Sequence, residues 1–399
     1  MELDSPVRGV RVAAAAAGIR YQDRDDLVLV ELPTGAHCAA TFTRNAFCAA
    51  PVTVAREHLG SVAPRWLLIN AGNANAGTGS RGLGDARACC AALAELTQCE
   101  PSQVLPFSTG VIGEYLPTDR IIQTLSKALA GLTEDGWDAA ARAIMTTDTK
   151  PKRVTRQVML GSRRATITGI AKGAGMIRPD MATMLAFVAT DAAIETPVLE
   201  QCLKAAVDGS FNAITIDGDT STNDACVLVA AGTLENPPID GNAGAELAEF
   251  QRALDAVCGE LAEEIVRDGE GATKLVSIEV SEGRSIAEAR QVADTIAHSP
   301  LVKTALFAGD PNWGRILAAV GRAGLEGLDI ERVRISLDDV LIVSAGGRDP
   351  SYTEAAGSAV MDKDVFAIRV QLGRGDAHAR VLTCDLSYDY VRINAEYRT

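Results

Sequence analysis

The chain has 399 residues, which is too long for one simple hydrophobic core and predicts two structural domains. Its 38 lysine and arginine residues against 52 aspartate and glutamate residues give a formal net charge of −14 at pH 7. An acidic surface of this kind opposes nucleic acid and anionic membranes, so neither is an expected partner.

The sequence shows no pattern of secretion, of a membrane span or of a metal site. The first residues lack the basic and apolar regions of a signal peptide, and no apolar segment is long enough to span a bilayer, so the cytoplasm is the expected location. The nine cysteines are odd in number without a Cys-x-x-Cys pair, and the four histidines lack ligand spacing. We therefore expect reduced thiols and no metal or other cofactor.

Strands and turns alternate through the first part of the chain. Residues 27–32 and 39–43 are predicted strands, and residues 66–69 form a third, compact and apolar strand. The segment 70–79 is rich in glycine and asparagine, which both tolerate left-handed backbone. It matches neither the dinucleotide fingerprint nor the Walker pattern, so a structural turn before the predicted helix 84–96 is the favoured interpretation.

A strand from Val104 leads into a small-residue turn at Ser108, Thr109 and Gly110. One interpretation is a turn with no further role. The other is an oxyanion hole, in which a hydroxyl and a backbone N–H freed by glycine geometry meet the negative oxygen of a tetrahedral intermediate. The residues alone leave both interpretations open.

Three elements are expected between this turn and the middle of the chain. Residues 118–129 are predicted to form a capped amphipathic helix, and a helix over 139–145 ends at the hydroxyl-rich segment 146–151. Residues 154–170 are predicted to form a hairpin.

The segment 172–188 joins a glycine-rich turn to a run that is predicted to be a buried strand, with Thr183 at the mouth of that run. Threonine favours strands, so one interpretation is a strand residue whose hydroxyl bonds to backbone. The other is a self-cleaving nucleophile that attacks the preceding carbonyl and forms an ester, which water then splits. Thr183 would become a chain N-terminus, and its α-amine, with an ordinary pKa of about 7.7–8.0, would serve as base for its own hydroxyl.

The second half of the chain begins with a polar cluster. Residues 217–224 contain three aspartates and one asparagine, but their spacing misses the EF-hand calcium pattern. A long amphipathic helix is predicted over 247–265, and several short strands over 331–385. Glu270 lies between two glycines and is either an exposed turn acid or a ligand for an ammonium group.

Two motifs carry a specific resemblance. Lys-Gly-Ala-Gly-Met at 172–176, followed by Met-Ala-Thr-Met-Leu at 181–185, resembles the self-processing site of the ornithine acetyltransferase (glutamate N-acetyltransferase) family of arginine biosynthesis. The resemblance covers nearly the whole chain. It implies an α/β fold with two β-sheets sandwiched by helices, an N-terminal-nucleophile-like αββα arrangement, and a second, smaller α/β domain.

The same resemblance implies autoproteolysis between Ala182 and Thr183. Cleavage there would give an α segment, 1–182, and a β segment, 183–399, which pair and dimerise as an α2β2 heterotetramer. Thr183 would then carry the acetyl group from N-acetylornithine to glutamate by a ping-pong route. Some members of the family also accept acetyl-CoA as donor, and no residue of this chain decides that point.

Roles for single residues follow from the resemblance. Thr109 and Gly110 are expected to hold the oxyanion. Lys172 is expected to pair with a substrate carboxylate and to lower the pKa of the neighbouring amine. The expected substrate contacts are Thr146, with Thr147 as the near alternative, Lys172, Thr183, Glu270, Asn394 and Thr399. The segment 217–224 is expected to form a hydrogen-bonded loop that lines the site without a required metal.

Two other functions stay open at this point. An N-terminal-nucleophile amidase or aminopeptidase would use the same cleavage and oxyanion chemistry and give the acyl group to water. A non-catalytic binding protein would keep Thr183 as an ordinary strand residue.

Overall fold

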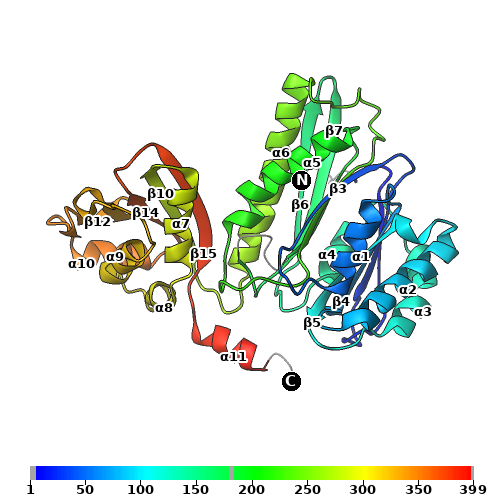
Figure 1. The fold of residues 1–399 in the computed structure, drawn as a ribbon, viewed down its shortest axis with the longest axis horizontal. Coiled ribbons are helices and arrows are strands. Elements are labelled where there is room, and N and C mark those ends of the chain that lie inside the picture. The colour runs from blue at the N-terminus through cyan, green and yellow to red at the C-terminus, as the bar shows by residue number, and fades with distance from the viewer. Residues whose placement is uncertain (1–5, 179–183, 397–399) are drawn as a thin grey trace. The chain divides into compact units, whose positions relative to one another are not determined.

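The chain forms two compact units in a computed structural model, which describes residues 6–178 and 184–396 (Figure 1). Unit 1 comprises Met1–Asn212 and Asp219–Ile265, and unit 2 comprises Ala213–Gly218 and Val266–Thr399. Both units mix helices and strands, so the predicted α/β class is confirmed. The predicted cleavage point, between Ala182 and Thr183, lies outside the described residues.

Unit 1 contains two β-sheets. The first has the order β1-β2-β4-β5, with only β4 and β5 parallel. The second has the order β3-β9-β8-β7-β6, with only β8 and β9 parallel. The strands are β1 (Arg11–Ala15), β2 (Leu27–Glu31), β3 (His37–Phe42), β4 (Trp66–Asn73), β5 (Val104–Val111), β6 (Lys152–Leu160), β7 (Arg163–Lys172), β8 (Leu185–Thr190) and β9 (Ala225–Ala230).

The two sheets of unit 1 pack face to face because each presents apolar side chains to the other. Phe107 of β5 and Phe187 of β8 meet edge to face at the centre of this core, with ring centroids 5.1 Å apart. The outer face of the first sheet packs against Leu93 and Leu125 of two helices. On the second sheet, a Cβ at Gly169 would lie 2.9 Å from Leu261, so a helix packs closely there.

These contacts confirm the predicted helix–sheet–sheet–helix layering. The hairpin expected over 154–170 is β6 and β7, and the long amphipathic helix expected over 247–265 is α6. The helices of unit 1 are α1 (Ala50–Leu59), α2 (Gly79–Thr97), α3 (Thr118–Ala130), α4 (Trp137–Ala143), α5 (Thr196–Gly209) and α6 (Gly244–Arg267).

Unit 2 is the smaller α/β unit. Its sheet has the order β13-β12-β11-β14-β10-β15, and alternate strand residues such as Ile278, Ile368 and Val381 share one core with the helices. Its strands are β10 (Leu275–Gly283), β11 (Arg334–Leu337), β12 (Val340–Ser344), β13 (Gly347–Arg348), β14 (Val365–Gln371) and β15 (Ala377–Cys384). Its helices are α7 (Ile286–Ala297), α8 (Pro300–Ala308), α9 (Trp313–Gly321), α10 (Glu354–Met361) and α11 (Tyr388–Glu396).

One local prediction is wrong. The turn expected at Ser108, Thr109 and Gly110 is instead the last part of β5, which pairs with β4. Gly110 stays in the strand with a φ of +133°, a conformation that side chains other than glycine rarely adopt.

Candidate active site

The strand end that carries Thr109 and Gly110 lies against the end of β4. Thr109 is buried, and Gly110 is opposite Gly72 in the parallel pairing. A Cβ at Gly110 would lie 2.2 Å from the carbonyl carbon of Gly72, so only glycine permits this approach of the two backbones. The close approach fixes the peptide planes around Gly110, which an oxyanion hole requires.

The asparagine-rich segment 70–79, whose first four residues are the end of β4, supports this strand end. Asn70 accepts a hydrogen bond from the Ser108 hydroxyl at 2.5 Å and donates to the Asn73 carbonyl at 2.9 Å. Asn75 has a positive φ of 47° and donates to the Gly82 carbonyl at 2.9 Å, which ties the turn to α2. Residues 70–73 therefore extend β4 beyond the predicted strand 66–69, and the predicted turn is confined to the residues between Asn73 and α2.

Asp148 organises a second part of the site. Its carboxylate accepts hydrogen bonds from Lys152 Nζ at 2.7 Å, from the Gly173 amide at 2.7 Å and from the Thr146 amide at 3.0 Å. Lys172 Nζ lies 4.0 Å away, with only 5% of its side chain exposed. Asp148 thus brings together Thr146 and Lys172, two of the residues that the resemblance implied.

The two lysines keep the Asp148 carboxyl group ionised. Burial would raise the pKa of Asp148, but the charges of Lys172 and Lys152 outweigh it and lower that pKa to about 2. Two buried cations therefore surround one carboxylate. The cluster has an excess of positive charge that can attract an anionic group.

The beginning of β8 lies beside Lys172. Lys172 is the last residue of β7 and pairs with Leu185, the first residue of β8. Met184 is buried, and its amide donates to Asp224 Oδ1 at 3.1 Å. The predicted nucleophile Thr183 and its neighbour Ala182 lie outside the described residues.

The asparagine before Asp224 joins this region to the strand end at Thr109. Asn223 Nδ2 donates to the Ser108 carbonyl at 2.9 Å and to the Ala74 carbonyl at 2.7 Å. The resemblance predicted residues 217–224 as a hydrogen-bonded loop that lines the site. It could not indicate these contacts, because the partners are more than a hundred residues away in the chain.

Two predicted residues meet in unit 2. Asn394 Nδ2 donates to Glu270 Oε2 at 2.8 Å, and Glu270 is only 8% exposed, so the exposed-turn interpretation of Glu270 is wrong. Gly271 has a φ of +69°, and a Cβ there would lie 2.5 Å from the Tyr390 amide, which brings α11 close to Glu270. Thr399 lies outside the described residues. Thr109, Gly110, Thr146 and Lys172 belong to unit 1.

The side chains that commonly bind metals are dispersed. Within residues 6–178 and 184–396, no group of three or more histidine, cysteine, aspartate or glutamate side chains is arranged to hold a metal. All nine cysteines are free thiols. No helix in the described part of the chain combines the length and apolar character that a membrane span needs.

Known proteins resemble this chain over almost its full length. The model of the ArgJ family matches residues 11–399. The arginine biosynthesis bifunctional protein ArgJ of Methylococcus capsulatus is 64% identical over 394 residues, which cover 99% of this chain and 96% of that protein. The protein of the same name from Psychrobacter arcticus is 53% identical, with 99% and 97% covered.

A solved structure adds to these matches. The crystal structure of the arginine biosynthesis bifunctional protein ArgJ from Bacillus halodurans is 41% identical, with a TM-score of 0.50. The match covers 53% of this chain and 98% of that chain.

Proposed function

This chain belongs to the ArgJ family, and we propose that it transfers the acetyl group of N2-acetylornithine to glutamate in arginine biosynthesis. The match of the family model to residues 11–399 carries this proposal. The chain is therefore an acetyltransferase enzyme, and a non-catalytic binding protein is no longer supported. The relatives are named bifunctional, so we include acetyl-CoA as a second donor in the proposal.

The proposed reaction begins with self-cleavage between Ala182 and Thr183. The Thr183 hydroxyl attacks the carbonyl carbon of Ala182, the C–N bond breaks, and water hydrolyses the ester to free the α-amine of Thr183. The length of the solved relative supports this step. About half of this chain matches nearly all of the solved chain, and the segment 183–399 is just over half of this chain.

Acetyl transfer then uses the same hydroxyl. The α-amine of Thr183 takes the hydroxyl proton, and the oxygen attacks the acetyl carbonyl of the donor. The Thr109 hydroxyl and the Gly110 amide stabilise the negative oxygen of the tetrahedral intermediate. Ornithine leaves with the proton, the acetyl group stays on Thr183 as an ester, and the amine of glutamate attacks that ester in the second half-reaction.

The buried charges have separate tasks in this proposal. Lys172 pairs with a substrate carboxylate, and its charge lowers the pKa of the Thr183 amine, so that more of the amine is a free base. Thr146 adds a hydroxyl contact to the substrate. Glu270, held by Asn394, binds a substrate ammonium group, and Thr399 completes the substrate contacts. The enzyme assembles as an α2β2 heterotetramer in the cytoplasm.

Intact mass and product analysis test this function. The purified protein should consist of segments 1–182 and 183–399, and it should move acetyl groups from N-acetylornithine to glutamate. Free acetate as the main product would instead favour the amidase reaction. A Thr183→Ala protein that stays uncleaved yet keeps transfer activity would overturn the assignment of the nucleophile.

A further inference from the structure

The dipeptide Asn223–Asp224 connects the two sheets of unit 1 at the candidate site. It lies directly before β9. Both residues are buried: Asn223 is 6% exposed and Asp224 is 1% exposed. The Asn223 side chain donates to the carbonyl of Ser108, the residue before Thr109. The Asp224 side chain accepts from the amide of Met184, the residue after Thr183.

Backbone hydrogen bonds fix the chain around Asp224. Its backbone carbonyl accepts a hydrogen bond from the Thr43 amide at 2.9 Å, and the Ala225 amide donates to the Met184 carbonyl at 3.2 Å. Oδ1 and the Met184 amide are therefore fixed to each other by a ring of hydrogen bonds. The second oxygen, Oδ2, is buried and makes no well-formed hydrogen bond among the described residues, although the hydroxyls of Ser221 and Thr43 lie close enough to favour the charged form.

The environment favours the neutral form of this carboxyl group. Burial raises the pKa of Asp224 well above its ordinary value, although the Met184 amide, the charge of Lys172 and the hydroxyls of Ser221 and Thr43 oppose the shift. An amide side chain has nearly the same shape as a protonated carboxyl group. Asparagine at this position can therefore keep the acceptor for the Met184 amide.

The covalent chain makes the Met184 contact important. The amide of Met184 shares one peptide plane with the carbonyl group of Thr183. Once the bond before Thr183 is cut, that peptide plane is the sole covalent attachment of the proposed nucleophile. Asp224 thus holds the nearest described backbone group to the reacting hydroxyl, while Asn223 holds the strand that carries Thr109 and Gly110.

We propose that Asn223 and Asp224 are positioning residues that set the Thr183 hydroxyl against the Thr109–Gly110 oxyanion hole. The inference rests on the proposed function, because it takes Thr183 as the nucleophile. Misplacing reacting groups by about 1 Å can cost about 100-fold in rate. Loss of either contact should therefore slow self-cleavage or acetyl transfer much more than it weakens substrate binding.

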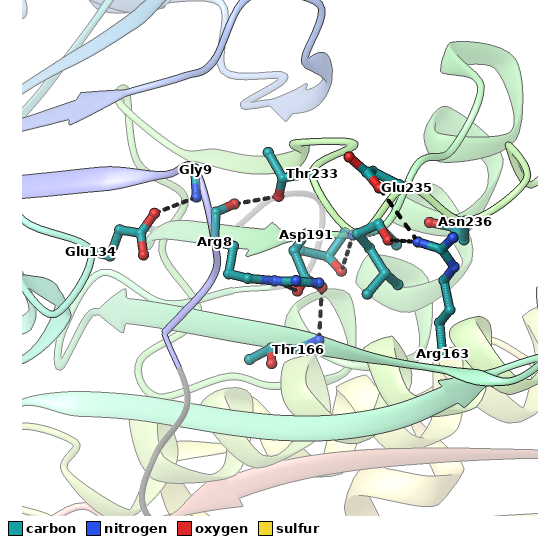
Figure 2. Close-up of polar contacts among 12 residues, drawn as sticks. Arg8, Gly9, Glu134, Arg163, Thr166, Asp191, Thr233, Glu235 and Asn236 are labelled. Carbon is teal, nitrogen blue, oxygen red and sulfur yellow. Dashed lines mark hydrogen bonds and ion pairs between the residues drawn. The ribbon is translucent and has the colours of Figure 1, made fainter.

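The far end of β8 offers matched control residues (Figure 2). Asp191 follows the last residue of β8 and accepts a hydrogen bond from the Thr166 amide at 2.9 Å. Asn236 is buried and exchanges hydrogen bonds with the backbone of Ala193, at 2.8 Å and 3.2 Å. Both residues make contacts that resemble those of Asn223 and Asp224 chemically. Asp191 lies about 20 Å from the beginning of β8, because the six residues of the strand rise about 3.3 Å each.

The experiment compares Asn223→Ala, Asp224→Ala and Asp224→Asn with Asn236→Ala and Asp191→Asn in the full chain. Segment masses, melting temperature, kcat and KM are measured for each. We expect Asn223→Ala and Asp224→Ala to stop cleavage or to lower kcat about 100-fold, with KM within about threefold. Asp224→Asn should restore cleavage and most of kcat, and the two controls should keep wild-type kcat at a comparable loss of melting temperature.

Two results would overturn the inference: wild-type cleavage and kcat in both Asn223→Ala and Asp224→Ala, or an equal loss of kcat in the controls. If a variant at Asn223 fails to fold, the Asp224→Ala and Asp224→Asn pair decides alone, because equal kcat in that pair contradicts the proposed role. Failure of the proposed function is distinct, because the wild-type protein itself would then show no acetyl transfer to glutamate.

Discussion

The strand β8 has a buried aspartate at each end, and the two aspartates have different surroundings. At the far end, Asp191 accepts the Thr166 amide through one oxygen and Arg8 Nε, at 3.1 Å, through the other. At the near end, Asp224 accepts the Met184 amide, and burial raises its pKa well above the ordinary value, although Lys172 and the hydroxyls of Ser221 and Thr43 oppose the shift. Figure 2 shows the far end, where further contacts tie Arg8 and Gly9 to Thr233 and Glu134.

This comparison separates a structural end of the strand from a functional one. A carboxylate with an amide on one oxygen and a cation on the other is fully satisfied and serves to hold chain segments together. A carboxyl group whose pKa is raised by burial costs stability when it is ionised, and such groups cluster at sites where they act. The near end of β8 should therefore lose activity on mutation, whereas the far end should lose only stability.

The largest difference is expected between Thr183, which precedes β8 in the sequence, and Thr190, the last residue of β8. Thr183→Ala should lower acetyl transfer by about 10⁴-fold or more and block self-cleavage, because the proposed nucleophile is removed. Thr190→Ala removes a buried hydroxyl that accepts the Ala192 amide at 3.2 Å, and it should cost about 1 kcal/mol of stability. Transfer assays and urea unfolding measure both. Equal transfer activity of the two variants would contradict the assignment of Thr183 as the nucleophile.

The next largest effect concerns two glycines with positive φ. Gly110→Ala places a Cβ 2.2 Å from the Gly72 carbonyl carbon, so we expect a loss of about 3 kcal/mol or more and loss of self-cleavage. At Gly161, in the turn between β6 and β7, an added Cβ would meet no atom closer than 3.6 Å, and Gly161→Ala should cost only about 1 kcal/mol. Thermal unfolding and segment masses check this pair. Full cleavage of the Gly110→Ala chain would count against the oxyanion strand.

Asp148 should give the near end a distinct acid sensitivity. Its pKa is about 2 in the folded chain and near 3.8 ordinarily, so its ion pairs stabilise the fold above pH 4 and this contribution is lost as the pH falls toward 2. The loss amounts to about 2 kcal/mol. The gap in unfolding free energy between wild type and Asp148→Asn should shrink by that amount over this range. A gap independent of pH would show that the ion pairs do not form.

The smallest effect is expected at Arg8. The Arg8 side chain is 53% exposed, and exposed ion pairs contribute under about 1 kcal/mol, even though its partner Asp191 is buried. Arg8→Ala should leave kcat unchanged and lower the melting temperature slightly. A loss of kcat in this variant would mean that the far end also takes part in the reaction.

The sequence predicted elements best where the signal is local. The hairpin of β6 and β7 and the amphipathic helix α6 follow from residue periodicity and turn residues. The strand conformation of Thr109 and Gly110 could not be predicted in this way, because the residues Ser-Thr-Gly favour a turn. Only the approach of Gly72 shows why this strand needs a glycine with positive φ at position 110.

The candidate site was predictable in part, through motif resemblance. That resemblance indicated Lys172 and Thr146, which Asp148 then brings together. The resemblance placed residues 217–224 at the site, but the contacts of Asn223 and Asp224 were not predictable, because their partners Ser108 and Met184 are distant in the sequence. Residues 213–218 belong to unit 2, although the residues on both sides of them in the sequence belong to unit 1, and the residue pattern did not predict this.

The most direct test of the central claim, that the near end of β8 carries the acyl group, is mass spectrometry of a quenched reaction. The protein is mixed with N-acetylornithine without glutamate, denatured in acid and weighed as intact segments. The account predicts two segments, 1–182 and 183–399, with one acetyl group on Thr183 of the second. An active chain that remains unbroken, or an acetyl group on any other residue, would contradict it.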